Sequence, residues 1–166
     1  MRPIWIVALS LAVSGSFPVM AADEFALLKA ERIGPLRIGL PEGEVARGIA
    51  CKPRRGPVTR WEADGDSHQE WAYPDCGITL DMIATTPQEA WAIGAITLTR
   101  PSPWKTRRGI GIGDTERAVM AAYGHDRSAE DSAPGKNFVA GSVYGGLMLT
   151  FEGGRVTRIF LGAAAE

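Results

Sequence analysis

The sequence predicts an α+β fold with two tandem units, each a helix followed by an antiparallel meander, which share one sheet with the helices on one face. Three observations predict it. A stretch near the N-terminus recurs further along the chain, the hydrophobic period changes from about 3.6 to about 2 after each copy, and a Gly-Gly pair separates the last two strands. The predicted organisation is a signal peptide at 1–21, a first unit at 22–100, a linker at 101–108 and a second unit at 109–166.

The recurring stretch is PLRIGLPEGEVARGIA, at 35–50, which aligns with GIGIGDTERAVMAAYG, at 109–124. This alignment pairs Leu36 with Ile110 and Val45 with Val119. Two shorter matches follow in the same order: GITLDM with GLMLTF, and AIGAITL with RVTRIFL. Three collinear matches indicate a duplicated unit.

A helix is predicted in the second copy, after the turn formed by its glycines. Asp114 can cap the helix by accepting from free backbone N–H groups, and Gly124 can end it. The apolar positions fall on one face: Ala118, Val119, Ala122 and Tyr123. The glycines before the helix do not have the G-x-G-x-x-G spacing of a dinucleotide site, so we expect no cofactor there. In the first copy, Pro41 suits the first helical position.

Alternating apolar residues predict the strands that follow each helix. Two of these strands flank Gly153-Gly154, a two-residue hairpin signal. The predicted strands lie at 77–82, 92–98, 146–151 and 155–161, and further strands are expected at 58–63, 68–73 and 137–144.

The N-terminus has the features of a secretory signal. Met1-Arg2 is positively charged, an apolar run covers 4–13, and Val19-Met20-Ala21 offers small residues for processing. The run is shorter than the roughly 20 residues that cross a bilayer, and no cysteine lies near the cut to carry a lipid. We therefore expect a periplasmic or secreted protein with no membrane span or lipid anchor. The formal net charge of −1 argues against a dedicated polyanion binder, and we expect no nucleic-acid partner.

Cys51 and Cys76 are the two cysteines of the chain. In an oxidising compartment such a pair forms a disulfide. The alternative is a zinc site with His68 and His125, but the spacing contains no C-x-x-C or H-x-x-x-H pair. We expect a disulfide and no metal.

The stretch at 109–124, duplicated, followed by antiparallel strands and joined to an export signal, resembles the tandem-repeat architecture of the β-lactamase inhibitory proteins. Its single unit is also similar to the SmpA/OmlA outer-membrane assembly proteins. The first resemblance implies a concave sheet that presents aromatic and polar residues to another protein, and neither implies an enzyme. Two departures stand out: only the first unit has a cysteine pair, and the anchoring cysteine of the SmpA/OmlA proteins is missing.

Two patterns suggest catalysis or metal binding. The run DGDSHQE, at 64–70, alternates Asp64, Asp66, His68 and Glu70, which in an extended chain would face a divalent cation together. A solvated hairpin tip explains the same run. A hydrolase triad could use Ser67 with His68, or His125 with Asp126 and Ser128, but neighbours in sequence rarely converge as nucleophile and base, and no G-x-S-x-G elbow is present. We expect no enzyme and no catalytic residue.

Two stretches, at 52–60 and 100–108, are basic. We interpret them as solvated loops or as sites for an acidic protein or a lipopolysaccharide-like anion. The aromatic residues of the first unit and the linker carry more information, because tryptophan and tyrosine dominate interface energetics. They are Trp61, Trp71, Tyr73, Trp91 and Trp104.

The leading hypothesis is an exported protein-binding module, an enzyme inhibitor among the options, with these five aromatic residues as its binding surface. The alternatives are a small-ligand or anion carrier of the cell envelope, and a weak metal-dependent hydrolase. The partner expected is another envelope or extracellular protein.

Overall fold

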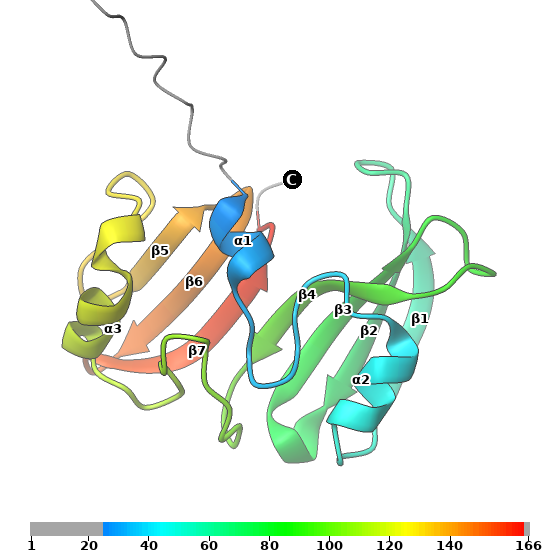
Figure 1. The fold of residues 1–166 in the computed structure, drawn as a ribbon, viewed down its shortest axis with the longest axis horizontal. Coiled ribbons are helices and arrows are strands. Elements are labelled where there is room, and N and C mark those ends of the chain that lie inside the picture. Colours follow the sequence, from blue (N-terminus) through cyan, green and yellow to red (C-terminus); the bar gives the residue numbers. More distant parts are fainter. Residues whose placement is uncertain (1–24, 165–166) are drawn as a thin grey trace, which may run out of the picture.

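A computed structural model describes residues 25–164, so the predicted signal peptide lies outside the described residues. The chain forms one 7-stranded antiparallel sheet in the order β1-β2-β3-β4-β7-β6-β5 (Figure 1). The α+β class and the antiparallel sheet are thus confirmed. The strands are β1 (Arg54–Arg60), β2 (Ser67–Tyr73), β3 (Ile78–Ala84), β4 (Ala92–Leu98), β5 (Asn137–Ser142), β6 (Gly145–Glu152) and β7 (Arg155–Gly162).

The helices α1 (Ala26–Ala30), α2 (Glu42–Gly48) and α3 (Glu116–Tyr123) lie on one face of the sheet (Figure 1). Two 3-10 turns, Pro74–Cys76 and Gly124–Asp126, follow β2 and α3. The core lies between helices and sheet, where Val45 of α2 and Val119 of α3 are fully buried with the inward residues of the strands. The opposite face of the sheet carries no described helix.

The helix predicted in the second copy is present, with a different cap. Val119 and Tyr123 are fully buried, and Ala118 and Ala122 pack against them, as the period predicts. The N-cap is Thr115, whose hydroxyl accepts from the Ala118 N–H. The predicted cap Asp114 instead accepts from the Gly111 N–H, one turn earlier.

The strands agree with the predicted ones within a few residues. The largest difference is at β1, which ends at Arg60, because the Trp61 N–H turns to donate to the Asp66 carbonyl. Gly153 and Gly154 form the predicted hairpin turn, with φ of 57° and 71°. Left-handed values at both positions are those of a type I′ turn and favour glycine.

The sheet is continuous through a short seam between β4 and β7. Three residue pairs form it: Ile96 with Leu161, Thr97 with Phe160, and Leu98 with Ile159. On the two sides of the seam lie the hairpins β3–β4 and β6–β7, each interrupted by one irregularity in register. The seam therefore joins two hairpin-bearing halves through few backbone pairs.

The first described residues pack against the C-terminal half of the sheet. The Phe25 ring and Leu28 fill the space above Gly145 of β6, where an added Cβ would collide with the ring. Glu31 is buried, and its carboxylate accepts from the Arg107 N–H at 2.8 Å and from the Tyr123 hydroxyl at 2.8 Å. Residues 25–31, within the predicted first unit at 22–100, thus contact the strands and α3 of the other half.

Cys51 and Cys76 form the predicted disulfide. It ties the segment after α2 to the turn before β3. None of the helices in the described part of the chain is long and apolar enough to cross a membrane.

Candidate functional site on the open face of the sheet

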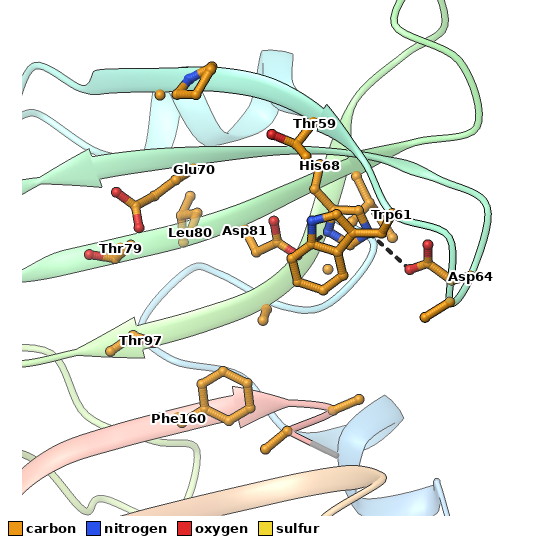
Figure 2. Close-up of a pocket in the computed structure, with 18 residues that line it drawn as sticks. Thr59, Trp61, Asp64, His68, Glu70, Thr79, Leu80, Asp81, Thr97 and Phe160 are labelled. Carbon is orange, nitrogen blue, oxygen red and sulfur yellow. Dashed lines mark hydrogen bonds and ion pairs between the residues drawn. The ribbon is translucent and has the colours of Figure 1, made fainter. Parts of the chain in front are cut away.

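A hollow of about 950 Å³ lies on the sheet face that the helices leave uncovered, which we call the open face (Figure 2). Its residues come from β1 to β4, from the β1–β2 turn and from β7. The hollow extends from Trp61 at the hairpin tip to Phe160 across the seam, with carboxylates and hydroxyls between them (Figure 2). A volume of this size is within the range of ligand sites.

Small residues form the floor of the hollow. Asp81 of β3 pairs with Ala95 of β4, and the next position along the sheet is Gly162. A Cβ at Gly162 would lie 2.8 Å from the Ala95 Cβ, and one at Gly94 would lie 2.7 Å from the side chain of Ile83. Side chains at these two positions would therefore displace Ile83 or Ala95, which line the hollow.

The carboxylates of Asp64 and Asp81 hold His68 between them. The His68 Nδ1 atom lies 2.8 Å from Asp81 Oδ2, and its Nε2 atom lies 2.9 Å from Asp64 Oδ2. The Trp61 indole stacks on the imidazole with ring centroids 3.8 Å apart and planes 8° from parallel (Figure 2). Since a carboxylate only accepts, both ring nitrogens donate when the imidazole is protonated. We call this group the His68 clamp.

The clamp favours the imidazolium form. Burial lowers the pKa of His68, but the hydrogen bonds and negative charges of Asp64 and Asp81 outweigh it, so the pKa is raised above its ordinary value. The pKa of Asp64 is lowered, first by the Asp66 N–H and then by His68. Burial raises the pKa of Asp81, and His68 offsets only part of that effect. The protonated form of His68 is thus a cation that both carboxylates already contact.

Beside the clamp, two acidic residues occupy paired positions on neighbouring strands. Glu70 of β2 lies directly opposite Asp81 of β3. Like charges at directly opposed positions destabilise a sheet. Within residues 25–164, no hydrogen bond or ion pair joins the Glu70 side chain to another group. This end of the hollow therefore carries negative charge that the described residues leave unbalanced.

The other end is uncharged at its floor and has one cation at its rim. Thr79, Thr97 and Phe160 lie in one row across β3, β4 and β7. Arg158 donates to the Thr97 hydroxyl at 3.4 Å, and its guanidinium lies 5.3 Å from the Phe160 ring centroid. The hollow is therefore polarised, with carboxylates at the β2–β3 side and an aromatic ring at the β7 side.

The structure separates the five aromatic residues predicted as a binding surface. Trp71, Tyr73 and Trp91 are only 1%, 2% and 8% exposed and belong to the core, so they offer no surface to a partner. Trp104 is half-buried and packs beside Gly34. Trp61, 38% exposed, is the member of the five that lines the hollow. Trp71 and Tyr73 are buried because they occupy the β2 positions that alternate with His68 and Glu70, and these positions face the core.

Only some of the polar side chains predicted to act together in the run 64–70 contact one another. Asp64 meets His68 because the β1–β2 turn folds back, whereas Asp66 accepts from the Trp61 N–H through its carbonyl in that turn. No group of three metal-ligating side chains that could hold an ion occurs among residues 25–164.

The candidate triads have other partners. Ser67 is buried, and both nitrogens of His68 contact carboxylates. In the second candidate, Asp126 binds Arg108 at 2.6 Å and Ser128 donates to Asp131 at 2.7 Å. The contacts of the described residues therefore contain no serine–histidine–carboxylate chain.

Asp81, Thr97 and Phe160 are site residues that the sequence patterns do not single out. All three occupy outward positions of strands whose alternate residues are buried. A search for polar or aromatic residues at the outward positions of every predicted strand would have found them.

Comparison with known proteins identifies no relative for this chain: no family model, no curated sequence and no solved structure matches it.

Proposed function

We propose that this chain is an exported protein-binding module that recognises another envelope or extracellular protein through the open face of its sheet. An enzyme that it inhibits is one kind of partner this role includes. The observation that carries the proposal is the hollow itself, a broad concave surface on the face that no described helix covers.

The composition of the open face supports a partner. A solvent-facing sheet surface needs only polar residues, yet this one combines Trp61 and Phe160 with Asp64, Asp81 and Glu70 around a floor of small residues. Aromatic residues within a polar rim are typical of interface centres. The clamp also holds Trp61 in one orientation by stacking, and a rigid anchor loses less conformational entropy on binding.

Repeated backbone contacts support the view that two duplicated units form this surface. The Gly39 N–H donates to the Ile93 carbonyl, and the Gly113 N–H donates to the Val156 carbonyl. These are equivalent positions in the sequence matches. The hairpins also agree, since the register shifts after Asp81 in β3 and after Thr150 in β6, which are again equivalent. Export is supported by the disulfide, a bond that persists in oxidising compartments.

A cross-linking experiment tests the proposal. A photoreactive benzoylphenylalanine replaces Thr97 on the open face in one variant and Met120 of α3, which is 43% exposed on the helix side, in a matched control. Irradiation in cells of the source organism, followed by mass spectrometry, should yield a partner from position 97 alone. The purified partner should then bind the mature chain with an affinity that Trp61→Ala lowers at least tenfold.

Equal products from both positions, or none from position 97, would refute the open face as a protein-binding surface. A small molecule that co-purifies with the chain in native mass spectrometry, and is lost in Trp61→Ala, would favour the alternative of a small-ligand carrier. The observation that favours a small-ligand carrier as a second candidate function is the volume of the hollow, which is within the range of small-molecule sites.

A further inference from the structure

The charges around the hollow indicate the chemistry of its ligand. Resting on the proposed protein-binding role, we propose that the hollow receives a basic side chain, lysine or arginine, from the partner protein. Its charged end lies beside Glu70 and Asp81, and its aliphatic stem lies over Ala95 towards Phe160.

Unbalanced negative charge is the first argument. Asp64, Glu70 and Asp81 all line the hollow, and none of its lining residues is a lysine or an arginine. His68 is the one basic group among them, and both of its nitrogens are already in contact with Asp64 and Asp81. Glu70, directly opposite Asp81, therefore retains a like-charged neighbour that a partner's cation would neutralise.

The shape of the hollow is the second argument. Between the carboxylates and Phe160 the floor includes Ala95, whose small side chain leaves room for a long side chain lying along the sheet, while the Ile83 side chain covers Gly94. Lysine and arginine bury their methylene stems on apolar surface while the charged end reaches polar groups.

The chain's own Arg158 is a third argument. Its guanidinium lies 5.3 Å from the Phe160 ring centroid, so this aromatic wall already accommodates one arginine side chain. An acidic ligand would instead be repelled by the negative charges of the Glu70 and Asp81 carboxylates. Arg158, which reaches the Thr97 hydroxyl at the rim, places its own positive charge away from Glu70 and Asp81.

Small probes test the inference without knowledge of the partner. The mature chain, labelled with ¹⁵N, is titrated at neutral pH with the N-acetyl, N-methylamide forms of lysine, arginine and norleucine, and backbone amide shifts are followed. Norleucine keeps the lysine stem and lacks the charge. We expect saturable shifts at Asp81, Ala95 and Thr97 with lysine and arginine, and at least fivefold weaker binding of norleucine.

Two substitutions should change the affinity in opposite directions. Glu70→Gln removes one charge from a side chain with no described internal partner and should weaken lysine binding about tenfold. Arg158→Gln removes a positive charge at the rim that repels an incoming cation and should strengthen lysine binding about twofold. Glu89→Gln, on the exposed loop between β3 and β4, is the matched control and should leave the affinity unchanged.

Equal binding of norleucine and lysine, no effect of Glu70→Gln, or no saturable shift with any probe would overturn the inference. These failures are distinct from failure of the proposed function. A partner cross-linked at position 97 that places no basic residue against Glu70 would leave the protein-binding role standing and refute the cation site alone.

Discussion

Replacement of His68 by alanine tests the central contact of the open face. The substitution removes the 2.8 Å bond to Asp81 and the stacking with Trp61. A hydrogen bond to a charged group contributes about 1.5–3 kcal/mol, and a stacked aromatic pair contributes about 0.5–1.5 kcal/mol. We therefore expect His68→Ala to lower the free energy of unfolding by about 2–4 kcal/mol where the imidazole is protonated.

The loss should depend on pH. The pKa of His68 is raised in the folded protein, because the two carboxylates outweigh the effect of burial, so its stabilisation is complete below the unfolded pKa of 6.5 and disappears as pH rises through the folded pKa. On the acid side the clamp weakens as the carboxylates are protonated. Asp81 is protonated before Asp64, because burial raises the pKa of Asp81 while the pKa of Asp64 is lowered. The difference between wild type and variant should be greatest between these titrations.

Urea unfolding followed by tryptophan fluorescence measures this difference, at about pH 6 and about pH 9. His125, the second of the two histidines, is exposed, and His125→Ala is the matched control. It should change stability by less than about 0.5 kcal/mol at both pH values. If His68→Ala cost the same free energy at both pH values, the imidazolium clamp would be refuted, and the residue would act by packing alone.

Three further substitutions test other contacts. Tyr123→Phe removes the hydroxyl that contacts Glu31 and Thr106, and should cost about 1.5–3 kcal/mol because the buried carboxylate loses a donor. Cys51→Ala with Cys76→Ala opens a loop with a sequence separation of 25 residues and should cost about 3.5 kcal/mol on the chain-entropy estimate. Thr115→Ala removes the side-chain cap of α3 and should cost about 1 kcal/mol. Urea unfolding measures all three.

Controls make these outcomes decisive. Tyr144, which is 60% exposed, gives the matched hydroxyl deletion Tyr144→Phe, and a similar loss in both tyrosine variants would contradict the buried Glu31 contact. For the disulfide, the reduced wild type should match the double alanine variant, and an unchanged stability on reduction would contradict the estimate. A Thr115→Ala variant as stable as the wild type would show that α3 needs no side-chain cap.

The α+β class and the antiparallel sheet could be predicted from periodicity, because strands such as β3 alternate regularly and the last hairpin carries Gly153-Gly154. The same alternation also indicates which residues of a strand share the exposed face, and the prediction of the binding surface did not use this information. In β2, His68 and Glu70 share one face while Trp71 and Tyr73 share the other, so the polar pair marks the open face and the aromatic pair must be buried. Prediction of a binding surface from aromatic type alone therefore selected core residues.

Other features could not be predicted, because they depend on tertiary contacts. Helix α1 has five residues and no side-chain cap, and Phe25 and Leu28 pack against Gly145 from a position far away in sequence. Asp81 and Phe160 line one hollow only because β4 pairs with β7, a contact that no local pattern encodes. For the N-terminus of α3, both Asp114 and Thr115 can act as caps, and propensity does not choose between adjacent residues.

The position of α1 has a consequence for how the chain is completed during synthesis. This helix precedes every strand of the sheet in the chain, yet its packing surface on β5 and β6 follows the first four strands. Until then a nascent chain ending after β4 has an unpaired edge at Ile96 and Leu98, and exposed edges of that kind promote association between chains. Arrival of the β5–β7 segment covers that edge with β7 and supplies the surface for α1, so α1 and the C-terminal strands pack in the same late event.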